Sequence, residues 1–143
     1  MQYTSHIRKN GSLVERQTVE EHCLNTAALA ANYGESFSCP QLARLIGTFH
    51  DIGKLCADFD DYINKRNNLS RGSIDHCYAG ARYLGHKAEA SGQKSMVEMA
   101  ELVGRVILSH HGLHDWIDAD GTYYYGNRIG KLERYDEDRK SVV

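Results

Sequence analysis

The chain has 143 residues, the size of one globular domain, and we expect a single domain over residues 1–143. Its 17 lysines and arginines against 19 aspartates and glutamates leave a net charge of −2, which excludes a strong overall attraction to nucleic acid. Any nucleic-acid partner must therefore be held locally or by another protein.

The sequence contains no run of roughly 20 apolar residues that could cross a bilayer, and its first residues lack the apolar core of a secretory signal. We therefore expect a cytoplasmic protein with no membrane partner. Four cysteines at positions 23, 39, 56 and 77 are too widely spaced for a Cys-x-x-Cys zinc site or a dense disulfide framework. They are predicted to be reduced and partly buried.

Apolar residues recur every three or four positions and the chain has a single proline, so the pattern predicts an all-α fold. The first helix is expected to run from Thr18 to Gly34, because Thr18 and Glu21 have the spacing of a capping box. Four more helices are expected at 40–50, 55–66, 75–90 and 94–109. The polar segment at 67–73 is the best candidate for a mobile lid.

Eight histidines stand out in the composition, because imidazole is both a common metal ligand and a base near neutral pH. Five of them, with one aspartate, fall at the ends or in the first turns of the expected helices: His22, His50, Asp51, His76, His110 and His111. Helix ends can converge on one cleft, and this donor set suits Mn, Fe, Co, Ni or Zn better than Ca or Mg. The other three, His6, His86 and His114, are interpreted as surface or packing residues.

The adjacent pairs at 50–51 and 110–111 are interpreted as ligands of two ions. Neighbouring helical residues project about 100° apart, so each pair can face two ions while Asp51 bridges them. Two ions about 3.5 to 4 Å apart form a clamp for in-line displacement at phosphorus. The same offset predicts that Cys23 and Cys77, which follow proposed ligands, point away and pack as small apolar side chains.

These motifs together resemble the HD phosphohydrolase superfamily and, within it, the CRISPR-associated HD nuclease of type I interference. The resemblance spans roughly residues 15–130 and is carried by Thr18-Val19-Glu20-Glu21-His22, His50-Asp51-Ile52-Gly53-Lys54, His76-Cys77-Tyr78-Ala79-Gly80-Ala81 and Ser109-His110-His111-Gly112-Leu113. It implies an HD-domain helical bundle with the metal site at converging helix ends.

The resemblance also implies roles for single residues. The implied metal ligands are His22, His50, Asp51, His76, His110 and His111, holding one or two divalent ions of Mn, Ni, Co, Fe or Zn, or Mg. Asp51 and Lys54 are the implied catalytic residues, with Asp51 bridging the ions and Lys54 beside the scissile phosphate.

The chain departs from the family at one ligand. The family usually supplies a further aspartate well after the His-His pair, and the downstream aspartates do not match its context: Asp115, Asp118, Asp120, Asp136 and Asp138. We therefore expect an amino-terminal fragment of a longer nuclease or nuclease-helicase, truncated at its carboxyl end.

The implied activity is divalent-metal-dependent endonuclease cleavage of single-stranded DNA in type I CRISPR antiviral defence. The implied partners are a helicase, fused or separate, that feeds the strand, and a guide-RNA surveillance complex. The tyrosines at 123–125 could stack bases, although adjacent aromatics more often cover a core edge. Two alternatives stay open: an HD nucleotide or cyclic-nucleotide phosphohydrolase, and a non-catalytic HD module. No Gly-Tyr-Pro follows His110-His111, which counts against the cyclic-dinucleotide branch.

Overall fold

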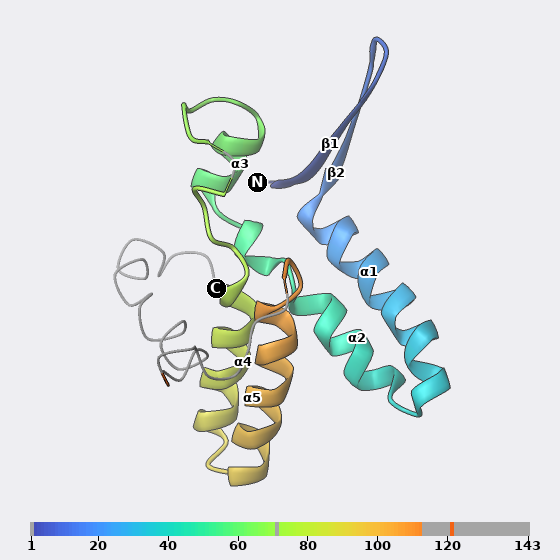
Figure 1. Cartoon of the computed structure of the whole chain (residues 1–143), viewed down its shortest axis with the longest axis vertical. Helices are drawn as coiled ribbons and strands as arrows, with labels where there is room; N and C mark the ends of the chain where they lie inside the picture. The colour runs from blue at the N-terminus through green and yellow to red at the C-terminus, as the bar shows by residue number, and fades with distance from the viewer. Residues whose placement is uncertain (1, 71, 113–120, 122–143) are drawn as a thin grey trace. The chain divides into compact units, whose positions relative to one another are not determined.

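Two units make up the computed structural model, which describes residues 2–70, 72–112 and 121. The first unit spans Met1–His76 and the second Cys77–Val143. Most of the described residues are helical, as predicted, with α1, α2 and α3 in the first unit and α4 and α5 in the second (Figure 1). Within the described residues, no helix is both long enough and apolar enough to span a membrane.

The prediction of an all-α fold is wrong at the start of the chain, where β1 (Thr4–Asn10) and β2 (Leu13–Thr18) form an antiparallel hairpin. Gly11 takes a positive φ of 60° in the two-residue turn between Asn10 and Leu13, the glycine placement of a type II′ turn. The strands are mostly exposed, so they lack the alternation of apolar and polar residues that marks a half-buried strand. The Gly11-Ser12 pair is the one sequence signal that indicates a hairpin turn between these strands.

The first helix, α1 (Val19–Gly34), begins as predicted. The Glu21 N–H donates to Thr18 Oγ1 at 3.1 Å, and the Thr18 N–H donates to Glu21 Oε2 at 2.9 Å. This capping box satisfies two backbone donors that the helix cannot satisfy itself. Because Thr18 is also the last residue of β2, the box fixes the point where the hairpin turns into the helix.

The second helix, α2 (Pro40–Phe49), also matches the prediction and lies beside α1 (Figure 1). The two helices approach closely at Gly47, where an added methyl group would lie 2.7 Å from the Cα of Ala27. A short 3-10 helix, η1 (Glu35–Phe37), makes the connection between them. Close packing of small residues therefore positions the carboxyl end of α2 against the middle of α1.

The third helix, α3 (Ala57–Ile63), follows a second 3-10 helix, η2 (Ile52–Lys54), and is shorter than the predicted 55–66. It ends because Asn64 leaves helical geometry and Lys65 adopts a left-handed φ of 57°. The Asp60 carboxylate of α3 accepts a hydrogen bond from the Thr4 N–H at 2.9 Å, which attaches the start of the hairpin to this helix.

The second unit contains α4 (Tyr78–Ala90) and α5 (Lys94–Leu108), which pack side by side (Figure 1). Gly92 makes the turn between them with a positive φ of 67°. The predicted α4 starts three residues too early, at Asp75, and the predicted α5 ends one residue too late. Ala100, Val103 and Ile107 are buried as the spacing predicted, whereas Met96 is exposed.

Several predictions fall outside the described residues. They concern His114, the tyrosines at 123–125 and the downstream aspartates at 115, 118, 120, 136 and 138.

Candidate metal centre

The first unit gathers its predicted site residues around one buried carboxylate, that of Asp51, whose exposed fraction is 2%. Its Oδ2 atom lies 2.9 Å from His22 Nε2 and 3.3 Å from His50 Nε2. The Lys54 ammonium lies 2.7 Å from the same oxygen. On the other side of the carboxylate, His76 Nε2 lies 3.3 Å from Oδ1. Four predicted residues thus surround Asp51 within the first unit.

Local structure explains how neighbours in sequence reach the same oxygen. His50 occupies the C-cap of α2, where the helix ends, and His22 lies in the first turns of α1. The 3-10 turn of η2 then brings Lys54 back over Asp51, with the Lys54 N–H donating to the Asp51 carbonyl at 3.0 Å. A 3-10 turn places residues i and i+3 one above the other, which suits an ion pair at that spacing.

Gly53 has a specific reason to be glycine. The backbone of His76 passes so close to it that an added Cβ would collide with the His76 carbonyl oxygen and lie 2.9 Å from the His76 Cα. This close approach lets the His76 imidazole reach the Asp51 carboxylate. His76 itself precedes α4 rather than opening it, so the predicted helical placement of this residue is wrong.

Backbone carbonyls orient two of the imidazoles around Asp51. His50 Nδ1 lies 2.8 Å from the Gly47 carbonyl oxygen, and His76 Nδ1 lies 3.4 Å from that of Ile74. A carbonyl oxygen only accepts, so Nδ1 carries the proton and donates it. In the neutral ring Nε2 then presents a lone pair toward Asp51, which is the tautomer that ligates a metal.

The donor atoms around Asp51 fit a divalent transition metal. His22 Nε2 lies 3.0 Å from His50 Nε2, in the same range as their distances to Asp51 Oδ2. Ligands that bind one ion at about 2.1 Å, at right angles, lie about 3 Å apart. Two imidazole nitrogens and a carboxylate are also the donor types that such ions prefer.

That the pair at 50–51 faces two ions, with Asp51 bridging them, stays a prediction. The helical offset of about 100° is not its structural basis, and the donor atoms of His50 and Asp51 lie 3.3 Å apart. The offset does not apply because α2 ends at Phe49, and Asp51, with φ −119° and ψ 12°, lies outside helical geometry.

The Lys54 side chain is more buried than is expected of a side chain that contacts substrate directly. Its exposed fraction is 3%, its Nζ lies 3.4 Å from Ser5 Oγ, and it stands 5.4 Å from the centre of the Phe59 ring. The ammonium is therefore held by the hairpin, α3 and Asp51 together, within reach of cation–π attraction.

His6 was interpreted as a surface or packing residue, and the structure adds it to the site. Its side chain is exposed, but its ring centre lies 4.5 Å from that of His22, and donor atoms of His6, His22 and Asp51 fall within 4.8 Å of one another. Partial removal of the ring from water and the nearby Lys54 charge lower the pKa of His6, which favours the neutral, ligating form. Only the unpredicted hairpin, which pairs His6 with Gln17 ahead of α1, brings it here.

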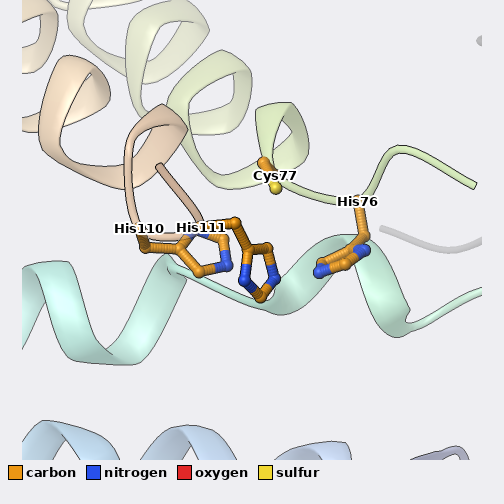
Figure 2. Close-up of side chains that lie close together, drawn as sticks. All are labelled: His76, Cys77, His110 and His111. Carbon is orange, nitrogen blue, oxygen red and sulfur yellow. The ribbon is translucent and has the colours of Figure 1, made fainter. Parts of the chain in front are cut away.

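A second group of donors belongs to the second unit. Cys77, His110 and His111 each offer an atom within 4.8 Å of the others (Figure 2). The two imidazoles lie side by side, 4.1 Å apart between ring centres, just beyond the end of α5. His110 Nδ1 lies 2.6 Å from the Ile107 carbonyl oxygen, which orients the ring as it does for His50 and His76.

The two cysteines beside predicted ligands behave differently. Cys23 is buried, and burial raises the pKa of its thiol to about 11, so it is a neutral packing group near pH 7, as predicted. Cys77 is buried too, but it does not point away from the ligands. Because α4 begins at Tyr78, the helical offset used to predict its direction does not exist at 76–77.

The predicted ligands therefore fall into two sets. His22, His50, Asp51 and His76 come together in the first unit, and His110 and His111 come together in the second. Sequence reasoning missed His6 and placed Cys77 incorrectly.

Comparison with known proteins adds one finding. A family model described as HD domain matches residues 19–140. No curated protein matches the chain.

Proposed function

Because the chain belongs to the HD domain family, whose members are metal-dependent phosphohydrolases, we propose that it hydrolyses phosphodiester bonds in single-stranded DNA. The observation that supports the proposal is the buried Asp51 carboxylate with the Nε2 atoms of His22, His50 and His76 within 3.3 Å. Burying several polar groups together costs stability unless they are paired or bind an ion. Packing alone therefore does not account for this set of side chains.

The proposed ligands of one or two divalent ions are His22, His50, Asp51 and His76, together with His110 and His111. The inclusion of the last two rests on the resemblance of the sequence motifs. Mn, Ni, Co, Fe or Zn suits these donors, and Mg is a weaker candidate. A bound ion would supply a Lewis acid and lower the pKa of a coordinated water.

The chain's own residues would perform four tasks. Asp51 holds the ion and the imidazoles in register, and the backbone carbonyls of Gly47 and Ile74 keep Nε2 of His50 and His76 directed inward. Lys54 keeps the Asp51 carboxylate in place through its 2.7 Å contact. From this buried position, its positive charge would also offset part of the negative charge that the phosphoryl oxygens gain in the transition state.

We further propose a role in type I CRISPR antiviral defence. With a net charge of −2, the chain would depend on a helicase, fused or separate, that supplies the single strand. A guide-RNA surveillance complex would recruit both. These partners are proposed from the sequence resemblance alone.

The test is cleavage of a labelled single-stranded oligonucleotide by the purified chain with Mn²⁺ or Ni²⁺. Asp51→Ala is expected to reduce cleavage at least about a hundredfold, because it removes the central ligand of the proposed ion. Glu89→Ala, an exposed carboxylate on α4, is the matched control and should keep full activity. Equal cleavage by wild type and Asp51→Ala would overturn the proposal.

The same preparation separates the alternatives. Faster turnover of deoxynucleoside triphosphates or cyclic dinucleotides than of oligonucleotides would identify a nucleotide phosphohydrolase. Elemental analysis showing no bound metal, with no turnover of any substrate, would identify a non-catalytic module.

A further inference from the structure

The hairpin and α3 enclose a groove that the metal centre does not use. It opens to solvent, has a volume of about 910 Å³, and lies entirely within the first unit. Lys9 and Arg16 contribute from the two strands, while Tyr62, Asn64 and Lys65 contribute from the end of α3 and beyond. The segment predicted as a lid supplies Asn67, Asn68 and Leu69 to the same groove.

The charge of this groove is opposite to that of the whole chain. Three cationic residues and no acidic residue are among the eleven described residues that line it, although the net charge of the chain is −2. Three asparagine side chains add both hydrogen-bond donors and acceptors. The lining therefore suits an anion that also carries polar groups.

One of the three cations, Arg16, is held in place by neighbouring polar groups. Arg16 donates a hydrogen bond to Asn64 Oδ1, and the Asn64 amide donates to Asp60 Oδ1 at 3.1 Å and to the Asp60 carbonyl at 2.8 Å. Lys65 adopts a left-handed φ of 57°, where glycine or asparagine is usual after a helix. Residues in this conformation are strained unless they are glycine or asparagine, and such residues cluster at functional sites.

One aromatic side chain connects the groove to the metal centre. Tyr62 lines the groove and contacts Phe59, with 5.8 Å between ring centres. Phe59 in turn contacts the His76 ring at 5.3 Å and lies under the Lys54 ammonium. Phe59 and Tyr62 are three residues apart on α3 and therefore share one face of that helix. The groove thus begins one aromatic side chain away from the Asp51 cluster, which consists of His22, His50, Asp51 and His76.

We propose that this groove binds the backbone of a single-stranded nucleic acid and leads it toward the Asp51 cluster. Lys9, Arg16 and Lys65 contact phosphates, while Tyr62 and the asparagines contact the bases, which only a single strand exposes. Cleavage of the bound strand rests on the proposed function. Binding of the strand in the groove does not require catalysis.

The test measures binding without cleavage. A fluorescein-labelled oligothymidylate of about 12 nucleotides is titrated with the full chain in EDTA, and anisotropy is followed over a range of salt concentrations. Lys9→Gln/Lys65→Gln is compared with Arg8→Gln/Lys94→Gln, which removes the same charge. Arg8 is the neighbour of Lys9 on β1, where alternation turns it to the other face of the hairpin, and Lys94 begins α5.

The groove variant should weaken binding about tenfold and reduce the dependence of log K on log salt by about 1.4, since each phosphate contact in a single strand contributes about 0.7. In the control variant, neither the affinity nor its dependence on salt should change by more than a small fraction. Equal weakening by both variants, or no binding by the wild type, would overturn the proposal. Equal competition by a duplex of the same length would overturn the assignment to a single strand.

Failure of the groove is distinguishable from failure of the proposed enzyme. Binding in EDTA with no cleavage in Mn²⁺ would support the groove as a binding site and overturn the proposed nuclease activity. If Lys9→Gln/Lys65→Gln cleaves and binds the oligonucleotide as the wild type does, the nuclease activity would be supported and the groove would be overturned as the binding site.

Discussion

At the scale of single residues, Asp51 and Lys54 form the ion pair on which the centre is built. Both side chains are at least 96% buried, and their charged atoms lie 2.7 Å apart. In the metal-free chain, Asp51→Asn should lower the free energy of unfolding by roughly 3 to 5 kcal/mol, because it leaves a buried ammonium without its carboxylate.

The double variant Asp51→Asn/Lys54→Met should recover part of that loss, since it removes both charges. Urea unfolding of the wild type, both single variants and the double variant at pH 7 in EDTA measures the coupling. Strict additivity of the two single effects would show that the ion pair does not stabilise the fold.

Gly53 leads to a second prediction at this scale. Gly53→Ala should destabilise the first unit and reduce metal binding, because the new methyl group must displace the His76 backbone that brings His76 to Asp51. Gly85→Ala is the matched control, since a Cβ there meets nothing within 4 Å and alanine favours the α4 helix by about 1 kcal/mol. Chemical denaturation and elemental analysis of the two variants compare them directly. Equal stability of both would contradict the proposed reason for the glycine.

At the scale of elements, Asp60 joins the hairpin to α3. Burial alone would raise the pKa of Asp60, but hydrogen bonds from the Thr4 N–H and the Arg66 guanidinium outweigh it and lower the pKa below its ordinary value of 3.8. A carboxyl group whose pKa is lower in the folded state stabilises the fold above its unfolded pKa. That stabilisation is lost as the pH falls through the folded value.

Asp60→Asn should therefore destabilise the chain at pH 7, and the difference from wild type should shrink as the pH falls below 3.8. Unfolding by urea at a series of pH values measures it, with Glu89→Gln as the control at an exposed carboxylate. A difference that stays constant down to pH 2 would show that the carboxylate charge is not what attaches the hairpin.

At the scale of the whole molecule, a bound ion should stabilise the folded chain. At a free Mn²⁺ concentration about 100 times the Kd, the gain is about 2.7 kcal/mol, because the ion binds the folded state and not the unfolded one. Thermal unfolding with Mn²⁺ and again after excess chelator should show a Tm that rises and then returns. Asp51→Ala should show little change, and an equal rise in that variant would place the ion elsewhere.

The helices were predictable because their signals are local. The Thr18–Glu21 capping box, the proline at the start of α2 and the apolar spacing of α5 each involve residues within a few positions of one another. The sequence signal for the family is also local, since the His50–Lys54 segment carries its motif in five consecutive residues. Among the helices, the predictions were weakest at the ends of α3 and the start of α4, where backbone conformations outside the helix decide.

The sequence by itself thus determined most of the helices and the family, while the tertiary structure decided how the predicted ligand residues meet. The hairpin carries His6 to His22, the close approach of His76 to Gly53 joins residues 23 positions apart, and the burial of Lys54 depends on Ser5 and Phe59. None of these contacts leaves a periodic pattern, because each depends on packing between segments that are distant in the chain. The cationic groove has the same origin, since Lys9, Arg16 and Lys65 become neighbours only when the hairpin is attached to α3.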